Sequence, residues 1–358
     1  MKKYVTLGEV CSKGSSNIAQ KDIEHNNGSY GIYGASGYIK DVDFYHQDKP
    51  YIAVVKDGAG IGRTMLLPEK TSVIGTMQYL IPNDMICVEY LYYAVTYMNL
   101  AKYFSGATIP HIYFKDYQKE KLPLLTIEEQ RKISDRLQKI DRLIELCGSI
   151  LEKMDVLVKS RFVEMFGDIE DVRTIADICS IITDGTHQPP KFTHNGIPFL
   201  FVSNIVTNEI IYNAEKFISE ETYEELYKRT PIEIGDIVLS TVGSYGHPAV
   251  VKTDRKFLFQ RHIAYLKPIS SVINSIYLHS AILSNDAQRQ IEERVKGIAQ
   301  KTLNLSEIRK ITVPVPPIAL QEQFAAFVEQ TDKSKLAVKQ VLEKAETLKK
   351  ALMQEYFG

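Results

Sequence analysis

Two long segments of the chain carry apolar residues at the spacing of one helix face. In segment 127–166 the steps between apolar residues alternate between four and three, which is the heptad pattern of a helix that buries one stripe. Thr126 followed by Glu128 and Glu129 is typical of a helix start, and Gly167 of a helix end. The pattern predicts one helix about 60 Å long. Its stripe comprises Ile133, Leu137, Ile140, Ile144, Cys147, Leu151, Met154 and Val158.

A second helix is predicted over 319–356, where the stripe is weaker. A lone helix of this length with one apolar stripe is not stable in water, so we expect the two helices to pack together as an antiparallel coiled coil. The alternative is that each helix packs only on its own domain. The second stripe comprises Phe324, Val328, Val338, Val341, Leu342, Ala345, Leu348 and Leu352. Less regular positions, and therefore candidates for partner docking, are Cys147, Arg161, Thr331 and Lys335.

The chain contains a long internal repeat. Segment 106–167 aligns with segment 297–358 at a constant offset of 191, without gaps. This repeat is longer than the units of solenoid proteins, and it indicates a duplicated domain-plus-helix unit. The molecule is therefore expected to be pseudo-two-fold symmetric, with a pseudo-symmetric partner such as a duplex or two copies of a protein. Identical pairs include Pro123/Pro314, Gln130/Gln321, Asp141/Asp332, Leu157/Leu348 and Phe166/Phe357.

The remaining sequence is mixed and rich in strand signals. Short β-like runs at 51–55, 237–240 and 249–252 lie between turns that contain Gly, Asn and Asp. The predicted class is α+β, with two mixed, strand-rich domains joined and separated by two long helices. The predicted boundaries are 1–124 for the first domain, 125–167 for the first helix, 168–315 for the second domain and 316–358 for the second helix.

The composition narrows the choice of function. Four scattered cysteines and no leader-like or membrane-spanning run favour a cytoplasmic protein without disulfides or zinc. The net charge is −1, whereas proteins that bind nucleic acid alone are usually basic. DNA binding would therefore need local basic patches or a basic partner.

The chain resembles the specificity subunit of type I restriction–modification systems over its whole length. The resemblance rests on the two domain-to-helix junctions, "LPLLTIEEQRKISDRL" at 122–137 and "VPVPPIALQEQFAAFV" at 313–328. It is strengthened by "EMFGD" at 164–168, "QEYFG" at 354–358 and "ITDGTHQPPKF" at 182–192.

This resemblance implies a non-catalytic DNA-recognition subunit. Each domain would recognise one half of a bipartite, asymmetric target in double-stranded DNA, and the helices would set the spacer. Two methyltransferase subunits would dock on the helices, and two motor-nuclease subunits would join them. S-adenosylmethionine, ATP and Mg²⁺ would belong to these partners, with no cofactor or metal on this chain. Alternatives are a related system with a fused methyltransferase-nuclease partner, and a coiled-coil scaffold that binds no DNA.

No catalytic motif is apparent in the sequence. The glycines at 58, 60 and 62 lack the spacing and the lysine of a phosphate-binding loop, so they indicate a turn between strands. The run Gln188-Pro189-Pro190-Lys191 lacks the Asn and the aromatic residue of an amino-methyltransferase motif. We expect both regions to face DNA instead.

Residues 248–310 contain eleven Lys and Arg against five acids, so the second domain is expected to hold phosphates more strongly. Gln and Arg make bidentate contacts with A and G, which favours Gln78, Arg261 and Gln300 for base recognition. Arg261 and His262 are expected to correspond to Thr76 and Met77. The full set of candidate DNA contacts is Ser36, Lys56, Arg63, Gln78, His111, Thr186, His187, Lys191, Ser244, Tyr245, His247, Arg261, His262, Gln300 and Lys301.

Overall fold

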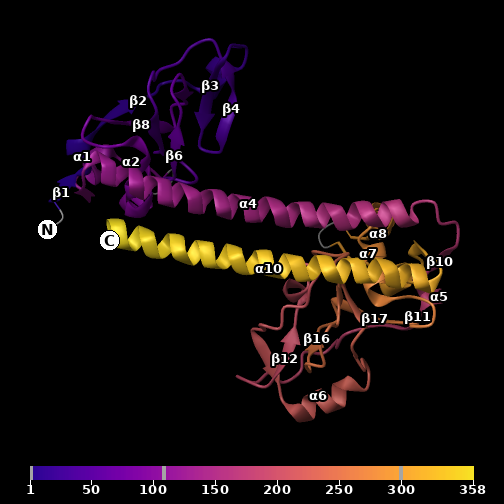
Figure 1. Ribbon diagram of the computed structural model, residues 1–358. Helices are drawn as coiled ribbons and strands as arrows, with labels where there is room; N and C mark the ends of the chain where they lie inside the picture. The colour runs from indigo at the N-terminus through magenta and orange to yellow at the C-terminus, as the bar shows by residue number, and fades with distance from the viewer. Residues whose placement is uncertain (1–2, 107–109, 298–300) are drawn as a thin grey trace. The chain divides into compact units, whose positions relative to one another are not determined.

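A computed structural model describes residues 3–106, 110–297 and 301–358 (Figure 1). The chain forms two compact units. Unit 1 comprises Met1–Ser149 with Lys339–Gly358, and unit 2 comprises Ile150–Val338. Two long helices, α4 (Ile127–Phe166) and α10 (Ile318–Phe357), each contribute residues to both units.

The bounds of both helices agree with the sequence prediction to within one residue. The start of α4 carries the predicted cap, because the backbone N–H of Thr126 donates to Glu129 Oε2 at 3.0 Å and the N–H of Glu129 donates to Thr126 Oγ1 at 3.3 Å. At its end, Gly167 N–H donates to Val163 O at 2.8 Å. None of the helices in the described part of the chain is both long and apolar enough to cross a membrane.

Unit 1 is built on a four-stranded antiparallel sheet of order β2-β8-β5-β6. A three-stranded sheet of order β4-β3-β7 and the pair β1-β9 complete its strands. The strands are β1 (Lys3–Thr6), β2 (Cys11–Ser15), β3 (Tyr30–Gly34), β4 (Gly37–Val42), β5 (Tyr51–Val55), β6 (Thr64–Leu67), β7 (Ser72–Val73), β8 (Met77–Pro82) and β9 (Lys121–Leu124). The helices are α1 (Leu7–Val10), η1 (Gln20–Ile23), α2 (Val88–Met98), η2 (Leu100–Tyr103) and α3 (Phe114–Tyr117).

Unit 2 repeats this topology with sheets β11-β17-β14-β15 and β13-β12-β16 and the pair β10-β18. The strands are β10 (Val172–Thr174), β11 (Cys179–Asp184), β12 (Ile197–Leu200), β13 (Lys216–Ile218), β14 (Ile237–Ser240), β15 (Pro248–Val250), β16 (Leu258–Phe259), β17 (Ile263–Pro268) and β18 (Thr312–Pro314). The helices are α5 (Ile175–Ile178), η3 (Val202–Asn204), α6 (Glu220–Tyr227), α7 (Ser275–Ile282), α8 (Asn285–Arg294) and α9 (Leu305–Ile308). The runs predicted at 51–55 and 237–240 are strands, whereas the run predicted at 249–252 is shifted, because β15 begins at Pro248 and ends at Val250.

One fully buried glutamine in each unit joins a long helix to its own domain. Gln130 accepts a hydrogen bond from Cys87 N at 2.8 Å and donates to Met85 O and Leu125 O at 3.1 and 2.9 Å. Gln321 makes the equivalent bonds to Asn274 N, Val272 O and Pro316 O at 2.8, 3.1 and 2.7 Å. The duplication therefore extends to individual hydrogen bonds.

A buried tyrosine in each unit receives the C-terminal end of the helix that begins at the other domain. Tyr90 of α2 donates to Pro123 O at 3.0 Å, and its ring lies 5.1 Å from that of Phe357. Tyr277 of α7 donates to Pro314 O at 2.8 Å, and its ring lies 4.8 Å from that of Phe166. Each unit is thus completed by residues from both halves of the repeat.

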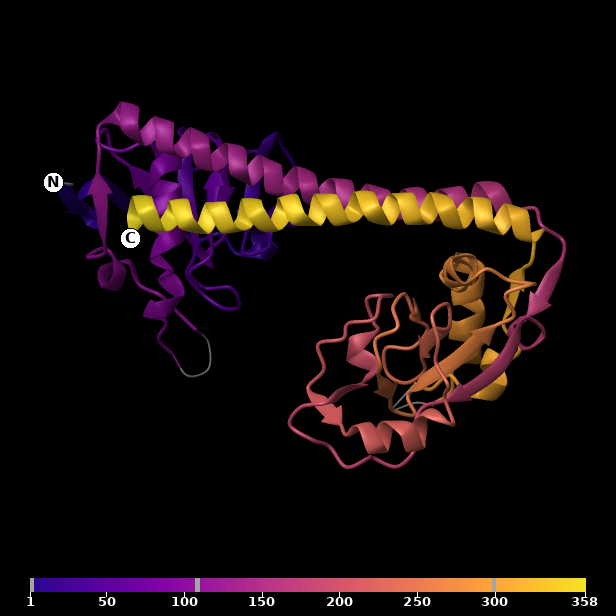
Figure 2. The ribbon, with the colours of Figure 1, turned by 60° about the horizontal axis from the view of Figure 1, so that its bottom comes forward.

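The two helices run antiparallel within each unit. In unit 1, Asp141 of α4 pairs with Lys349 at 2.5 Å, and further back along α4 Arg136 donates to Tyr356 Oη at 3.2 Å. Figure 2 shows these segments side by side. In unit 2, Asp155 pairs with Lys335 at 2.6 Å, and the rings of Phe162 and Phe324 lie 5.6 Å apart. The predicted antiparallel pairing is confirmed within each unit.

The predicted stripes face inward except at Val341 and Leu348, which are 44% and 50% exposed. Their buried members are Ile133, Leu137, Cys147, Phe324, Val328 and Ala345. Their half-buried members are Ile140, Ile144, Leu151, Met154, Val158, Val338, Leu342 and Leu352. The irregular positions are accounted for inside the protein, since Lys335 pairs with Asp155 and Thr331 donates to Phe327 O at 2.9 Å. Arg161 is half-buried and pairs with Glu164 at 2.8 Å.

Candidate nucleic-acid interface

In each unit several loops gather at one end of the four-stranded sheet. Because neighbouring strands are antiparallel, the end of β5, the start of β6, the start of β8 and the end of β2 meet at the same edge. The equivalent edge of unit 2 is formed by the end of β14, the starts of β15 and β17, and the end of β11. We call these the loop end of unit 1 and the loop end of unit 2.

The loop end of unit 1 brings together four predicted DNA contacts. Lys56 and Arg63 lie on the β5–β6 loop, and His111 pairs with Asp57 of that loop at 2.6 Å. Arg63 also donates to Ala35 O at 3.1 Å, which places it beside the β3–β4 turn that carries exposed Ser36. These residues come from three separate segments of the sequence.

The loop end of unit 2 holds most of the candidates predicted for the second domain. The N–H of Arg261 donates to Thr186 O at 3.0 Å, and the N–H of Gly243 donates to Lys301 O at 3.2 Å. The N–H of Thr241 donates to His262 O at 3.0 Å. Ser244 and Tyr245 lie on the same β14–β15 loop as Gly243, and Lys301 Nζ lies 3.3 Å from Tyr245 Oη. Exposed Lys191 lies further along the loop that carries Thr186 and His187.

Glycine backbones shape the two equivalent turns. Gly58 and Gly62 have φ of +83° and +78°, and their counterparts Gly243 and Gly246 have φ of +73° and +81°. These values lie in the left-handed region that favours glycine. At Gly62 a Cβ would also lie 2.4 Å from Ala101 N. The glycine-rich turn between strands predicted from the sequence is confirmed.

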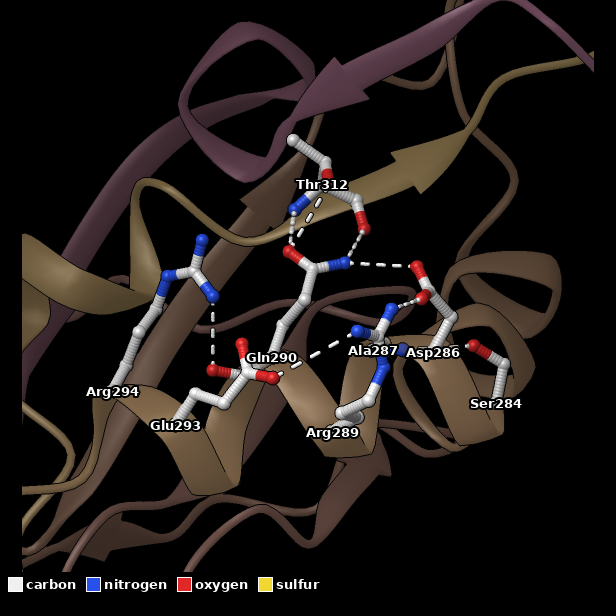
Figure 3. A network of polar contacts seen from close by, with 8 residues as sticks. All are labelled: Ser284, Asp286, Ala287, Arg289, Gln290, Glu293, Arg294 and Thr312. Carbon is white, nitrogen blue, oxygen red and sulfur yellow. Dashed lines mark hydrogen bonds and ion pairs between the residues drawn. The ribbon is translucent and has the colours of Figure 1, made fainter.

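A network of polar side chains joins α8 to β18 in unit 2 (Figure 3). Buried Gln290 donates to Thr312 O and accepts from Thr312 N, both at 3.0 Å. It also donates to Asp286 Oδ2 at 3.1 Å, and Asp286 pairs with Arg289. Ser284 caps the helix by accepting from Ala287 N at 3.3 Å. This network connects α8 to β18.

One predicted base contact is wrong, and one predicted correspondence is shifted. Gln78 is 1% exposed in β8 and donates to the Tyr117 hydroxyl, so its amide is a core group and cannot reach a base edge. The strand register pairs Val54 with Gln78 and Leu239 with Ala264. This register aligns Arg261 with Gly75 and His262 with Thr76, one residue from the correspondence expected. Gln300 lies outside the described residues.

Most basic side chains of 248–310 are already paired with acids. Six of the eleven make ion pairs, including Lys301 with Glu292 at 2.8 Å and Lys252 with Asp332 at 3.0 Å. Exposed Arg261 lies beside His262, and burial, followed by the charge of Arg261, lowers the pKa of His262. The predicted basic excess is therefore largely neutralised, and exposed Arg261 is one of the cations at this loop end, together with Lys191 and Lys301.

Other candidates are held in fixed positions by neighbouring side chains. His187 pairs with Asp184 at 2.9 Å, and Arg229 pairs with the same carboxylate at 2.7 Å. Half-buried His247 lies 3.1 Å from Asn208 Oδ1. These contacts orient the ring of each histidine. His247 therefore has a structural role in holding Asn208, in addition to its place at the surface.

The sequence reasoning missed two exposed aromatic residues near the loop end of unit 1. Phe104 and Tyr113 are 60% and 50% exposed. They flank Ser105 and His111, whose backbones exchange two hydrogen bonds of 2.8 Å. Exposed aromatic rings can stack on bases. No periodicity marks them, because they lie on loops rather than on a helix or strand face.

Comparison with known proteins shows which family the chain belongs to. The model of the type I restriction modification DNA specificity domain matches residues 2–154 and again residues 168–347. The chain belongs to this specificity-domain family. Each match covers one domain and most of the long helix that follows it, so the duplicated domain-plus-helix unit is the family's domain.

Several relatives of this specificity family are specificity subunits. The chain is 24% identical over 258 residues to the type I restriction enzyme EcoBI specificity subunit of Escherichia coli, covering 63% of this chain and 54% of that protein. It is 22% identical over 329 residues to the MjaVIII specificity subunit of Methanocaldococcus jannaschii, covering 84% and 77%. The chain thus spans about half the length of the first relative.

Solved structures show the same fold. The S subunit of a type I restriction-modification system from M. genitalium superposes with a TM-score of 0.68 at 16% identity, covering 100% of this chain and 96% of that one. A second structure, titled for complex assembly and conformational transition of the type I R-M system, superposes with a TM-score of 0.57 at 15% identity and covers 99% and 97%. The predicted α+β class with two domains linked by long helices is confirmed.

Proposed function

We propose that this chain is the DNA-specificity subunit of a type I restriction–modification complex and recognises a bipartite, asymmetric target. The loop end of unit 1 would contact one half-site and the loop end of unit 2 the other. The observation that carries the proposal is the duplicated loop end, in which equivalent backbones present different side chains. Arg261 corresponds to Gly75, and Tyr245 lies in a turn whose counterpart holds Ile61.

The proposal assigns no chemistry to this chain. Among the described residues, no group of three or more His, Cys, Asp or Glu side chains could hold a metal ion. S-adenosylmethionine is expected on methyltransferase partners, and ATP with Mg²⁺ on motor-nuclease partners. We expect two copies of each partner on one chain, in the cytoplasm.

Exposed apolar residues on the long helices support protein docking. Leu157 of α4 and its repeat equivalent Leu348 of α10 are 51% and 50% exposed. Leu146 and Leu336 are 56% and 59% exposed. Apolar side chains grouped on an otherwise polar helix mark interaction surfaces. The same exposed leucine in both repeats fits two copies of one partner, which we propose to be the methyltransferase subunit.

DNA binding in the presence of the methyltransferase tests this function. The complex should prefer one bipartite sequence, and the logarithm of its affinity should fall by about 0.9 per phosphate contact for each tenfold rise in salt. The ion pairing of most basic residues in 248–310 favours an alternative, a scaffold that binds proteins and no DNA. A methyltransferase complex that binds the chain but shows no sequence preference would establish that alternative.

A further inference from the structure

Unit 2 contains a large pocket whose counterpart in unit 1 is occupied by the chain's own tyrosines. The pocket has a volume of about 980 Å³ and lies between α4, α7, α10 and the loop at 207–212. Its walls are largely apolar and include Val158, Phe162, Ile276, Leu283 and Val328. All of its lining residues belong to unit 2.

The repeat identifies the side chains that differ between the two places. The conserved hydrogen bonds of Tyr90 and Tyr277 align α2 with α7. In this alignment Tyr92, Tyr93 and Tyr97 of unit 1 correspond to His279, Ser280 and Ser284 of unit 2. The hollow beside Tyr92 and Tyr93 has a volume of only about 470 Å³. Replacement of large rings by small polar side chains opens the pocket.

Unit 1 shows how a tyrosine occupies this place. Tyr93 is 2% exposed, and its hydroxyl donates to Asp141 Oδ2 at 2.8 Å, while Lys349 pairs with the other carboxylate oxygen of Asp141 at 2.5 Å. The repeat equivalent of Asp141 is Asp332, which lines the pocket of unit 2. There it is paired with Lys252 at 3.0 Å. A carboxylate has acceptor capacity for a further donor.

The wall of the pocket is rigidly held. Asn208, with φ of +62°, lies at the tip of the 207–212 loop. His279 Nε2 lies 3.1 Å from its carbonyl oxygen, and His247 Nδ1 lies 3.1 Å from its side-chain oxygen. Asn204 anchors the base of the loop by donating to Ile211 O at 2.9 Å. These hydrogen bonds hold the loop that forms one wall of the pocket.

We propose that this pocket accepts a tyrosine side chain from the methyltransferase subunit that docks on unit 2. A phenol has an apolar body for the walls and a donor for the carboxylate of Asp332. Val163, 62% exposed on α4, lines the pocket and lies on the same helix as Leu157 of the proposed docking surface. Because unit 1 fills its own counterpart, one such tyrosine enters per chain. The identity of the partner rests on the proposed function; the pocket's preference for a phenol does not.

The pocket is tested first on the free chain with p-cresol, the side chain of tyrosine as a free molecule. Ligand-observed NMR titration should show one saturable site in the wild-type chain and none in Ser280→Tyr, which installs the residue of unit 1. Ser280→Phe should also block the site, whereas Ser271→Tyr, an exposed serine outside the pocket, should not. Toluene should bind about fivefold more weakly than p-cresol, since it lacks the hydrogen bond.

Equal binding of p-cresol by the wild type and by folded Ser280→Tyr or Ser280→Phe would overturn the pocket assignment. Amide hydrogen exchange in α7 establishes that each variant is folded. The occupant is tested by repeating the titration after assembly with the methyltransferase. The site should disappear on assembly, and Ser280→Tyr should weaken assembly at least tenfold while the methylated motif stays the same. Unchanged p-cresol binding in the assembled complex would overturn the docked tyrosine, and a chain that supports no specific methylation would instead overturn the proposed function.

Discussion

Units 1 and 2 have the same internal hydrogen bonds between helix and domain, and they differ in the side chains at their loop ends. The three hydrogen bonds of Gln130 recur at Gln321, and the bond of Tyr90 to a proline carbonyl recurs at Tyr277. The loop ends share backbone turns but not side chains. Scaffold and specificity are therefore carried by different residues, and the loop ends can change while the junctions stay the same.

The units also differ in how the helix ends are packed. In unit 2, Phe166 contacts the rings of Phe162, Tyr277 and Phe324, with centroids 5.1, 4.8 and 5.4 Å away. In unit 1 the repeat equivalents of Phe162 and Phe324 are Met353 and Ile133. An aromatic cluster closes one unit, and a mixed apolar cluster closes the other.

The largest expected effect concerns these helix ends. Phe166→Ala should destabilise unit 2 by about 3–5 kcal/mol, because a 2% exposed ring leaves a cavity among three others. Phe357→Ala should cost unit 1 less, since that ring lies in the last turn of α10, where helices fray, and is 8% exposed. Urea unfolding followed by hydrogen exchange in α2 and α7 measures both. A larger loss for Phe357→Ala would show that the packing difference has been misjudged.

The glutamine junctions should behave alike in the two units. Gln130→Ala and Gln321→Ala each leave buried backbone groups without partners, and each should cost about 3 kcal/mol. The exposed Gln340→Ala on α10 serves as the control and should change stability little. The same unfolding measurement applies. Losses that differ by more than about 1 kcal/mol would argue against a shared scaffold.

Substitutions at the loop ends should affect one half-site each. Arg261→Ala should reduce discrimination at the half-site of unit 2 by about 5- to 150-fold, and Arg63→Ala should do the same at the other. Competition binding with DNA altered in one half at a time separates these effects. Arg131→Ala, exposed on α4, is the matched control. If either loop-end variant lost discrimination at both half-sites equally, the division between units would be wrong.

The smallest expected effect is a difference between the two units in how their stability depends on pH. Desolvation by surrounding protein atoms lowers the pKa of His279, whose counterpart in unit 1 is Tyr92. The unfolded chain gains this proton near pH 6.5 and folded unit 2 only at lower pH. Unit 2 should therefore have its full stability above about pH 6.5 and lose up to about 1.4 kcal/mol per pH unit below it.

His279→Gln should reduce this dependence, and exposed His25→Gln in unit 1 should leave it unchanged. Hydrogen exchange in α7 between pH 5 and pH 7.5, corrected for intrinsic rates, measures the difference. A wild-type pH dependence in His279→Gln would assign the effect to another group.

The sequence predicted the helices better than the loop ends, for a physical reason. A stripe repeating every three to four residues specifies a helix and its buried face over forty residues, so the bounds of α4 were correct. The sequence of a strand does not show which of its side chains lie in the core and which lie at the exposed end of the sheet. Gln78 looked like a base contact because of its side chain, yet strand pairing places it in the core beside Tyr117.

The role of Lys335 could not be predicted either. A lysine in an apolar stripe looks like an irregularity, but antiparallel pairing places Asp155 beside it. The glutamines were visible only as identical residues in the repeat. Their three bonds depend on Met85, Cys87 and Leu125, which are separated from Gln130 in sequence or unmarked by any motif.

The most direct test of the account is sequencing of methylated bases in DNA from cells that express this chain with its cognate methyltransferase. We expect a bipartite motif, two short half-sites around a gap of fixed length, with Arg63→Ala and Arg261→Ala relaxing different halves. A continuous motif, or no motif with an active methyltransferase, would contradict the assignment of one half-site to each unit.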